Sequence, residues 1–200
     1  MPTNKTHIIT GSGVGAVVAT AFQLPIIPLI LGASLGAGIP DIDTYKSSIS
    51  RKILIFKNHL AMKITYLIIG LAAIINGQLG VKFIGAFLIL AAISGHRKFT
   101  HSILGVLSFC GICLYSLNTP SSIIKYTVLG LVTGYATHIL TDSFSNHGIE
   151  LFWPINEKNF GFRLISTGKM SEHIFLAISS IIIYIMIKHF LNTKGSIIWF

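Results

Sequence analysis

Charged residues are scarce in this sequence, and acidic residues are the scarcest. The 200 residues include six Asp or Glu and fifteen Lys or Arg, so charged side chains make up 10% of the chain. A soluble globular domain has about 25%. This shortage excludes an ordinary soluble protein, and a hydrophobic content of 52% places the chain in the membrane class.

Cysteine is also nearly absent. The two cysteines, Cys110 and Cys113, lie in the run FCGIC inside an apolar segment. A C-x-x-C pair is redox-active or binds metal in some proteins, but no further Cys or His lies beside this one. We therefore interpret both as small packing residues of a membrane helix, and a disulfide framework is excluded. The amino terminus lacks a small-residue cleavage site after its apolar run, so we expect no cleavable signal peptide.

The formal net charge is nevertheless +9, which in a soluble protein would suggest a nucleic-acid partner. Here the basic residues lie in loops between apolar segments, where positive-inside topology and anionic lipid explain them better. We therefore expect membrane lipid and no nucleic acid as a partner. If the amino terminus is cytoplasmic and all segments cross, eleven Lys or Arg fall on the cytoplasmic side and four on the other. This bias supports a multi-pass protein of the cell membrane in that orientation.

Seven apolar segments predict an all-α, polytopic membrane helix bundle of about five to seven helices with a one-sided polar metal site and no sheet. Several are shorter than the roughly 20 residues that cross a bilayer, so the first two are alternatively a re-entrant pair. Gly11 and Gly15 have the spacing of closely packed membrane helices. We expect one domain over residues 1–200, with a surface amphipathic helix in the polar stretch 44–63. The segments are expected at about 8–22, 26–38, 60–75, 79–94, 102–117, 122–144 and 171–191.

Polar, ionisable residues recur at the ends of these segments, and the predicted topology puts them all on the cytoplasmic side. They are His7, Asp41, Asp43, His96, Arg97, His101, His138, Asp142 and Glu172. Such residues are costly in a membrane unless they are paired, solvated or bound to something. His138 and Asp142 are four apart and share one helix face. Mixed imidazole and carboxylate ligands suit Zn²⁺, Mn²⁺ or Fe²⁺, so the pattern predicts one metal site at this membrane face.

Each residue also has a simpler reading. His7 is alternatively a solvated interfacial residue, and Asp41 and Asp43 are alternatively turn or cap residues after Pro40. Thr100 or Ser102 caps the following helix in the simplest reading, which leaves His101 incidental. Glu172 is alternatively an acidic residue placed by the dipole of a first helical turn.

Three stretches resemble the YdjM-like family of inner-membrane metal-dependent hydrolases. They are LGAGIPDID at 35–43, GHRKFTHSILG at 95–105 and GYATHILTDSFSNHGIELFWP at 134–154. His7 matches the family's amino-terminal His, and TGKMSE at 167–172 resembles a weaker Gly-to-Glu feature. Lys98 stands where the family often has Gly, and residues 145–147 replace its Thr-Pro pattern. Neither departure removes an expected ligand.

The resemblance implies a membrane-embedded hydrolase that uses a divalent metal, and we expect it to cleave a phosphate ester of a lipid. The metal, most simply Zn, would be held by His7, Asp41, Asp43, His101, His138 and Asp142. Arg97 suits a phosphate contact because of its planar guanidinium. His96 or Glu172 would act as general acid or base or complete the metal shell. Aromatic residues of the 145–170 loop, Phe152, Trp153, Phe160 and Phe162, are expected at the interface, where they would admit the acyl chains.

Two alternatives to an enzyme fit the same cluster. One is a non-enzymatic membrane transporter or a metal- or proton-binding module, although transporters usually place the site near the midplane between repeats. The other is a structural protein in which the cluster locks helix ends together by ion pairs.

Overall fold

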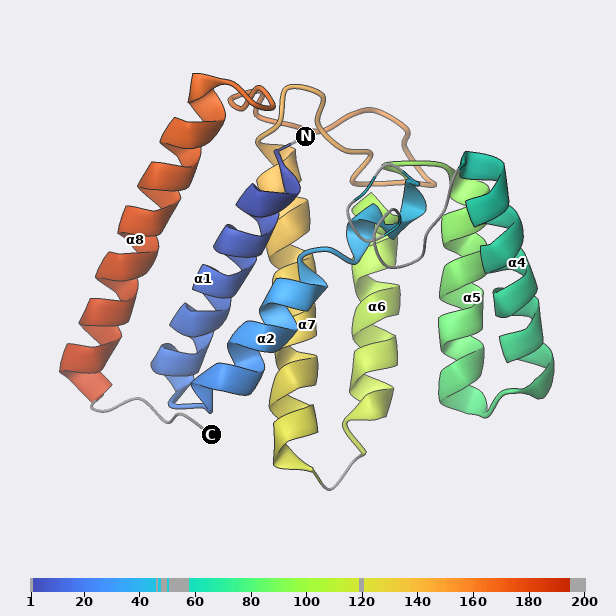
Figure 1. Ribbon diagram of the computed structural model, residues 1–200, viewed down its shortest axis with the longest axis horizontal. Coiled ribbons are helices and arrows are strands. Elements are labelled where there is room, and N and C mark those ends of the chain that lie inside the picture. Colours follow the sequence, from blue (N-terminus) through green and yellow to red (C-terminus); the bar gives the residue numbers. More distant parts are fainter. Residues whose placement is uncertain (1, 46, 48–49, 51–57, 119–120, 195–200) are drawn as a thin grey trace. The chain divides into compact units, whose positions relative to one another are not determined.

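The computed structural model describes residues 2–45, 47, 50, 58–118 and 121–194. In these residues it has seven α-helices, two short 3-10 helices and no β-strand (Figure 1). The α-helices are α1 (Asn4–Phe22), α2 (Ile26–Gly36), α4 (His59–Asn76), α5 (Leu79–Ser94), α6 (Ile103–Ser116), α7 (Ser122–Ser143) and α8 (Met170–Lys194). All seven segments predicted from the sequence are helices, and the all-α prediction is confirmed. Half of the stretch 44–63, in which we expected a surface amphipathic helix, lies outside the described residues.

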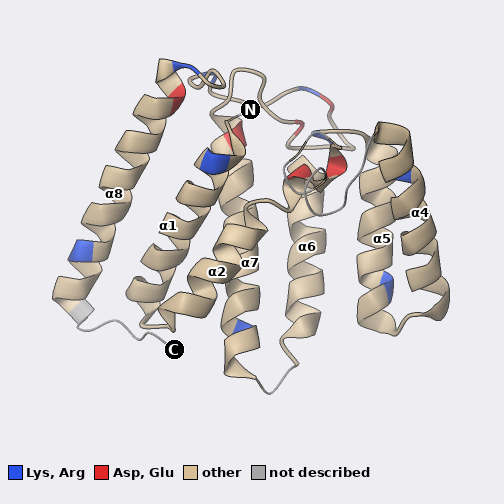
Figure 2. Ribbon diagram, viewed as in Figure 1, with Lys and Arg blue, Asp and Glu red and all other residues tan. Residues whose placement is uncertain are grey.

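Four segments of the described chain are long and apolar enough to cross a membrane. They are Ile26–Asp43, His59–Asn76, Ser122–Ser143 and Met170–Thr193. Helices α5 and α6 are apolar but shorter. Charged side chains are few along the helices, as Figure 2 shows, which is the pattern that a hydrocarbon environment requires.

The chain forms two compact units. The first comprises Met1–Ile39, Leu117–Gly148 and Gly161–Phe200, and the second comprises Pro40–Ser116 and Ile149–Phe160. In the first unit, α1 packs against α2, α7 and α8, and α2 packs closely on α7. In the second, α4 pairs with α5 and α6 packs beside α5, while the 3-10 helices η1 (Pro40–Asp43) and η2 (Phe99–His101) adjoin α5.

Glycines let the backbones of the first unit approach closely. A Cβ on Gly134 of α7 would lie 2.0 Å from the carbonyl oxygen of Ala33 in α2, and one on Gly32 would lie 2.0 Å from the carbonyl of Thr127. The predicted Gly11 and Gly15 pair packs α1 on Ala33 and Ala37 of α2 in the same way. Close approach through small residues is how membrane helices associate without a hydrophobic driving force between them.

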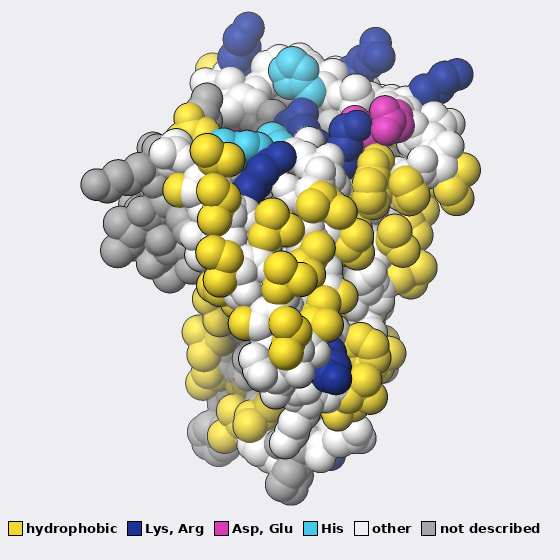
Figure 3. Space-filling model, turned by 90° about the vertical axis from the view of Figure 1, so that its right-hand side faces the viewer, with side chains coloured by type: hydrophobic (Ala, Val, Ile, Leu, Met, Phe, Trp, Pro, Cys, Tyr) yellow, Lys and Arg dark blue, Asp and Glu magenta, His cyan; other side chains and the backbone are white. Residues whose placement is uncertain are grey.

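The second unit exposes many large apolar side chains. Helix α4 exposes Leu60, Ile68 and Ile75 among others, and α5 exposes Phe83 and Ile93. Figure 3 shows many hydrophobic side chains on one face of the molecule, with histidine and most of the basic side chains toward one end. A surface of this kind is stable against lipid tails rather than water. The two cysteines of α6 form no disulfide, and Cys113 is buried as a packing residue.

Candidate metal centre

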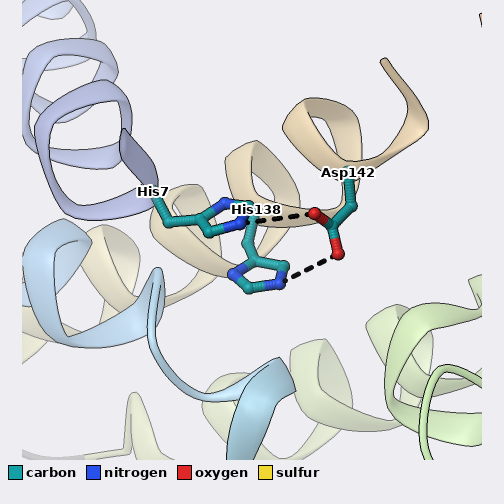
Figure 4. A group of neighbouring side chains, drawn as sticks. All are labelled: His7, His138 and Asp142. Atoms are coloured by element: carbon teal, nitrogen blue, oxygen red, sulfur yellow. Dashed lines mark ion pairs between the residues drawn. The ribbon is translucent and has the colours of Figure 1, made fainter. Parts of the chain in front are cut away.

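The strongest cluster in the first unit joins His7, His138 and Asp142. His7 lies in the first turns of α1, and His138 and Asp142 lie in the last turns of α7. Helix α1 packs on α7 so that its beginning meets the end of α7 (Figure 1). The four-residue spacing of His138 and Asp142 puts both side chains on one face of α7. All three side chains are fully buried, and Figure 4 shows them pointing toward one another.

The distances within this triad match shared ligation of one ion. The Nε2 atom of His7 lies 3.3 Å from Oδ1 of Asp142, and Nε2 of His138 lies 3.5 Å from Oδ2. The two imidazole rings are stacked, with centroids 3.8 Å apart and planes 14° from parallel. Ligand atoms bound to one tetrahedral zinc ion lie about 3.4 Å from each other, given zinc bonds of about 2.0–2.2 Å. One donor atom from each residue lies within 4.8 Å of the others.

A backbone carbonyl determines which nitrogen of His138 carries the proton. Its Nδ1 atom lies 2.6 Å from the carbonyl oxygen of Ala37, at the end of α2. A carbonyl only accepts, so Nδ1–H donates, and in the neutral tautomer the lone pair of Nε2 faces Asp142, where Nε2 and Oδ2 can bind one metal ion together. The 3.5 Å separation exceeds the 2.7–2.9 Å of a charge-assisted hydrogen bond and favours a metal ion over a proton.

This arrangement also has the outer support that metal-binding histidines usually have. A ligating His almost always donates its second ring N–H to a carbonyl or carboxylate, which fixes its orientation. The close packing of α2 on α7 places the Ala37 carbonyl for this role. The donor set of two imidazoles and one carboxylate fits Zn²⁺, and it also fits Fe²⁺ and Mn²⁺.

Glu172, at the start of α8, holds the first turn of α1. Its Oε1 atom accepts from the backbone N–H of Thr3 and, at 2.6 Å, from the hydroxyl of Thr6. Its Oε2 atom accepts from the backbone N–H of Gly168 at 2.7 Å. The side chain is buried. These bonds fix the turn that carries His7, next in the chain to Thr6.

The second unit contains a different cluster, built around Asp43. This carboxylate is buried at the end of η1 and takes three hydrogen bonds from the 96–100 stretch. Its Oδ1 lies 2.6 Å from Nδ1 of His96, and its Oδ2 accepts from the backbone N–H of Arg97 at 3.0 Å and the hydroxyl of Thr100 at 2.6 Å. One carboxylate therefore orders the loop that follows α5.

The backbone of this loop needs that support. Gly95 has φ +83° and Arg97 has φ +68°. The left-handed region is costly for a residue with a Cβ, by about 1–3 kcal/mol in strained sites. The hydrogen bond from the Arg97 N–H to Asp43 holds this conformation, and the side chain of His96 keeps 34% of its surface exposed. The loop thus presents one oriented imidazole at the surface of its unit.

His101 is buried beside the same carboxylates. Its Nδ1 lies 3.5 Å from Oδ2 of Asp43 and 3.0 Å from the hydroxyl of Thr100, and its Nε2 lies 3.8 Å from Oδ1 of Asp41. Asp41 and His101 therefore lie close enough to share a ligand. Lys98 pairs instead with Glu157 at 3.3 Å and Glu150 at 3.8 Å.

Each residue predicted for the site lies beside another predicted residue, except Glu172, which accepts hydrogen bonds from Thr3, Thr6 and Gly168. His7, His138 and Asp142 meet in the first unit, whereas Asp41, Asp43, His96, Arg97 and His101 gather in the second. Their roles as ligands and catalysts stay predictions. Ser102 caps α6, since its hydroxyl accepts from the Gly105 N–H at 3.1 Å, whereas Thr100 binds Asp43.

Three groups that support the two clusters were not identified from the sequence. The Ala37 carbonyl belongs to the backbone, so no side chain in the sequence points to it. The role of Thr6 depends on its hydrogen bond to Glu172, which is 166 positions away in the sequence. Thr100 stands beside His101 in a polar stretch, and that proximity was the one available signal.

Comparisons with known proteins identify the family. The family model described as YdjM inner membrane protein matches residues 1–199. The uncharacterized protein YvsG of Bacillus subtilis is 27% identical over 177 residues, which cover 88% of each chain. The inner membrane protein YdjM of Escherichia coli is 39% identical over 67 residues, which are 32% of this chain and 33% of that protein. The YdjM of Shigella flexneri matches to the same extent. No solved structure matches.

Proposed function

This chain belongs to the YdjM family of inner membrane proteins, and on that premise we propose that it is a metal-dependent hydrolase of the membrane that cleaves a phosphate ester of a lipid. The observation that carries the proposal is the buried triad of His7, His138 and Asp142, with N···O separations of 3.3 and 3.5 Å. Three protein ligands leave a coordination position open, which is typical of catalytic zinc sites and not of structural ones.

The triad would hold the ion, and the Ala37 carbonyl would keep His138 in its binding orientation. Zn²⁺ is the first candidate, with Mn²⁺ and Fe²⁺ as alternatives. Such an ion supplies activation of water near neutral pH and stabilisation of charge on a phosphoryl oxygen. Glu172 would act indirectly, because its carboxylate is engaged by Thr3, Thr6 and Gly168 and fixes the turn of His7.

The second cluster offers proton transfer and phosphate binding. A buried carboxylate that accepts from Nδ1 of a histidine leaves Nε2 available to exchange a proton, as in other carboxylate–histidine pairs. Asp43 and His96 have this arrangement. We therefore assign proton transfer to His96 in preference to Glu172. Arg97 would bind the phosphate group, since its planar guanidinium matches two phosphoryl oxygens.

Asp41, Asp43 and His101 remain our proposed further ligands. The 3.8 Å separation between His101 Nε2 and Asp41 Oδ1 supports such a role for that pair. Asp43 has the weaker claim, because its two oxygens already take three hydrogen bonds. The excess of basic residues beside these polar segment ends supports a site that faces the cytoplasm.

The proposal is tested with the full-length protein in detergent or nanodiscs. Metal content is measured by elemental analysis, and phosphate release from a short alkyl phosphate and from a lipid phosphate is measured with added Zn²⁺, Mn²⁺ or Fe²⁺. We expect His138→Ala to lose both the metal and the activity. The matched control is His189→Ala, which removes an exposed histidine of α8 and should change neither.

The alternatives give different results in this assay. A protein that binds metal through the triad but hydrolyses no phosphate ester would support the metal- or proton-binding module. A protein that binds no metal, and whose activity survives His138→Ala, would contradict the proposal itself.

A further inference from the structure

An apolar groove runs between α1, α7 and α8 in the first unit. Its volume is about 420 Å³. Helix α8 lines it with one continuous face that extends from Phe175 to Met186, and Val14 and Val17 line it from α1. Helix α7 contributes Leu140 and Phe144. None of the residues that line the groove belongs to the proposed metal site or takes part in the proposed proton transfer.

The groove offers a ligand almost no hydrogen-bonding groups, although threonines line it. The hydroxyl of Thr10 donates to the carbonyl of Thr6 at 2.8 Å, and that of Thr137 donates to the carbonyl of Thr133 at 2.8 Å. Each hydroxyl is thus satisfied within its own helix, which leaves the hydrocarbon part of the side chain to the groove. The lining suits a hydrocarbon and penalises a polar occupant, whose groups would lack partners.

The groove ends near the triad, although none of the three triad residues is among those that line it. His7, Thr10, Val14 and Val17 follow one another at spacings of three, four and three, so His7 continues the groove-lining face of α1 by one turn. On α7, the groove residues Thr137 and Thr141 are the chain neighbours of His138 and Asp142. A molecule that lies in the groove therefore has one end beside the triad.

We propose that this groove holds the hydrocarbon tail of the substrate, a single chain whose phosphate-bearing end reaches His7, His138 and Asp142. The inference rests on the proposed function and adds the substrate class, a lipid phosphate selected by the length of one tail. Selection by tail length follows because the lining extends only as far as Val17 and Met186, so carbons beyond these residues gain no further contact in the groove.

The position of the groove favours a lipid tail over a helix of a partner protein. The groove-lining part of α8 runs over the twelve residues from Phe175 to Met186, or about 16 Å at a rise of 1.5 Å per residue. A partner helix could cover this length but would bring no phosphate ester to the triad beyond its end, whereas a lipid phosphate carries both groups.

A labelling experiment tests occupancy without requiring catalysis. The probe is a non-hydrolysable alkyl phosphonate with a diazirine at the end of its tail, added to the full-length protein in nanodiscs. We expect saturable labelling near Val17 and Met186, which an excess of unlabelled dodecyl phosphonate displaces and ethyl phosphonate does not. Labelling that neither compound displaces would show bulk lipid contact only, and labelling displaced equally by both would show no tail recognition. Either result would overturn the proposal.

A kinetic experiment tests selection by tail length with a matched pair of variants. Ile182 lines the groove, whereas its neighbour Ile181 does not, and both are exposed isoleucines of α8. Ile182→Trp should lower the preference for a long-tailed over a short-tailed alkyl phosphate by about tenfold, the loss expected when roughly two methylene groups leave an apolar site. Ile181→Trp should leave the preference unchanged. Equal preferences in the two variants would overturn the proposal.

The two proposals fail in different ways. If the wild-type protein cleaves no phosphate ester but shows saturable, displaceable labelling, the hydrolase is wrong and the tail site stands. If it cleaves short and long phosphates at equal rates without specific labelling, the hydrolase stands and the tail site is wrong.

Discussion

The two polar clusters use the same residue types in opposite ways. In the first unit, His7, His138 and Asp142 project from long helices and are fully buried. The Nε2 atoms of the two histidines lie 3.3 and 3.5 Å from the carboxylate oxygens of Asp142, beyond the usual hydrogen-bond length. In the second, Asp43 takes hydrogen bonds of 2.6 to 3.0 Å from a loop, and His96 stays partly exposed. Longer separations between ligand atoms on rigid helices suit an ion between them, whereas short hydrogen bonds to a loop suit the orientation of a partly exposed histidine.

The first prediction breaks the triad and has the largest expected effect. Asp142→Asn keeps the volume but removes the charge and one ligand oxygen, so the affinity for Zn²⁺ should fall by more than about 100-fold, beyond the 10- to 100-fold cost of an outer-shell change. Isothermal titration of the metal-free protein measures this. The control is Asn146→Asp, which makes the reverse exchange in the loop after α7 and should leave the affinity for Zn²⁺ unchanged. An unchanged affinity in Asp142→Asn would remove this residue from the metal site.

The second prediction breaks the other cluster. Asp43→Asn weakens one buried acceptor that serves His96, Arg97 and Thr100, so the free energy of unfolding should fall by about 2–3 kcal/mol. Denaturant unfolding in detergent measures the loss, and Zn²⁺ affinity at the triad should persist. If instead the variant loses metal without losing stability, Asp43 is a ligand and the contrast between the clusters disappears.

The third prediction concerns the support of His7. Glu172→Gln replaces one acceptor oxygen by an amide group that cannot accept from Gly168. The first turn of α1 should loosen, and Zn²⁺ affinity should fall by about tenfold, as for other outer-shell changes. Glu172→Asp, which keeps the charge on a shorter side chain, should recover part of the affinity. Equal and complete loss of metal in both variants would point to direct ligation.

The smallest effect is expected at the cap of α6. Ser102→Ala removes the acceptor of the Gly105 N–H, so unfolding should become about 1 kcal/mol easier. Metal affinity and the orientation of His96 should not change, because Thr100 and not Ser102 contacts Asp43. A thermal melt with and without chelator separates the loss of the cap from a loss of metal, since only metal binding makes stability depend on free metal.

Hydropathy and turn residues together located the helices. The predicted segment at 79–94 coincides with α5, and the segment at 122–144 ends one residue beyond α7. Turn residues explain this accuracy, since Asn76-Gly77 and Pro120 interrupt strongly apolar runs. The shared face of His138 and Asp142 also followed from spacing, and the structure places their Nε2 and Oδ2 atoms 3.5 Å apart.

Long-range partners could not be predicted in the same way. Nothing in the local sequence links Glu172 to Thr6, because the contact depends on how α8 packs on α1. The orientation of His138 depends on a carbonyl of α2, and every residue has a carbonyl. The hydrogen bonds of Asp43 could not be predicted either, because two of its donors, the Arg97 N–H and the Thr100 hydroxyl, do not show in a pattern of ionisable residues.

The most direct test is the crystal structure of the full-length protein grown with Zn²⁺, with anomalous data collected at the zinc edge. We expect an anomalous peak bounded by Nε2 of His7, Nε2 of His138 and the carboxylate of Asp142, and no such peak in Asp142→Asn. A zinc-saturated wild-type protein with no peak at these three side chains would contradict it.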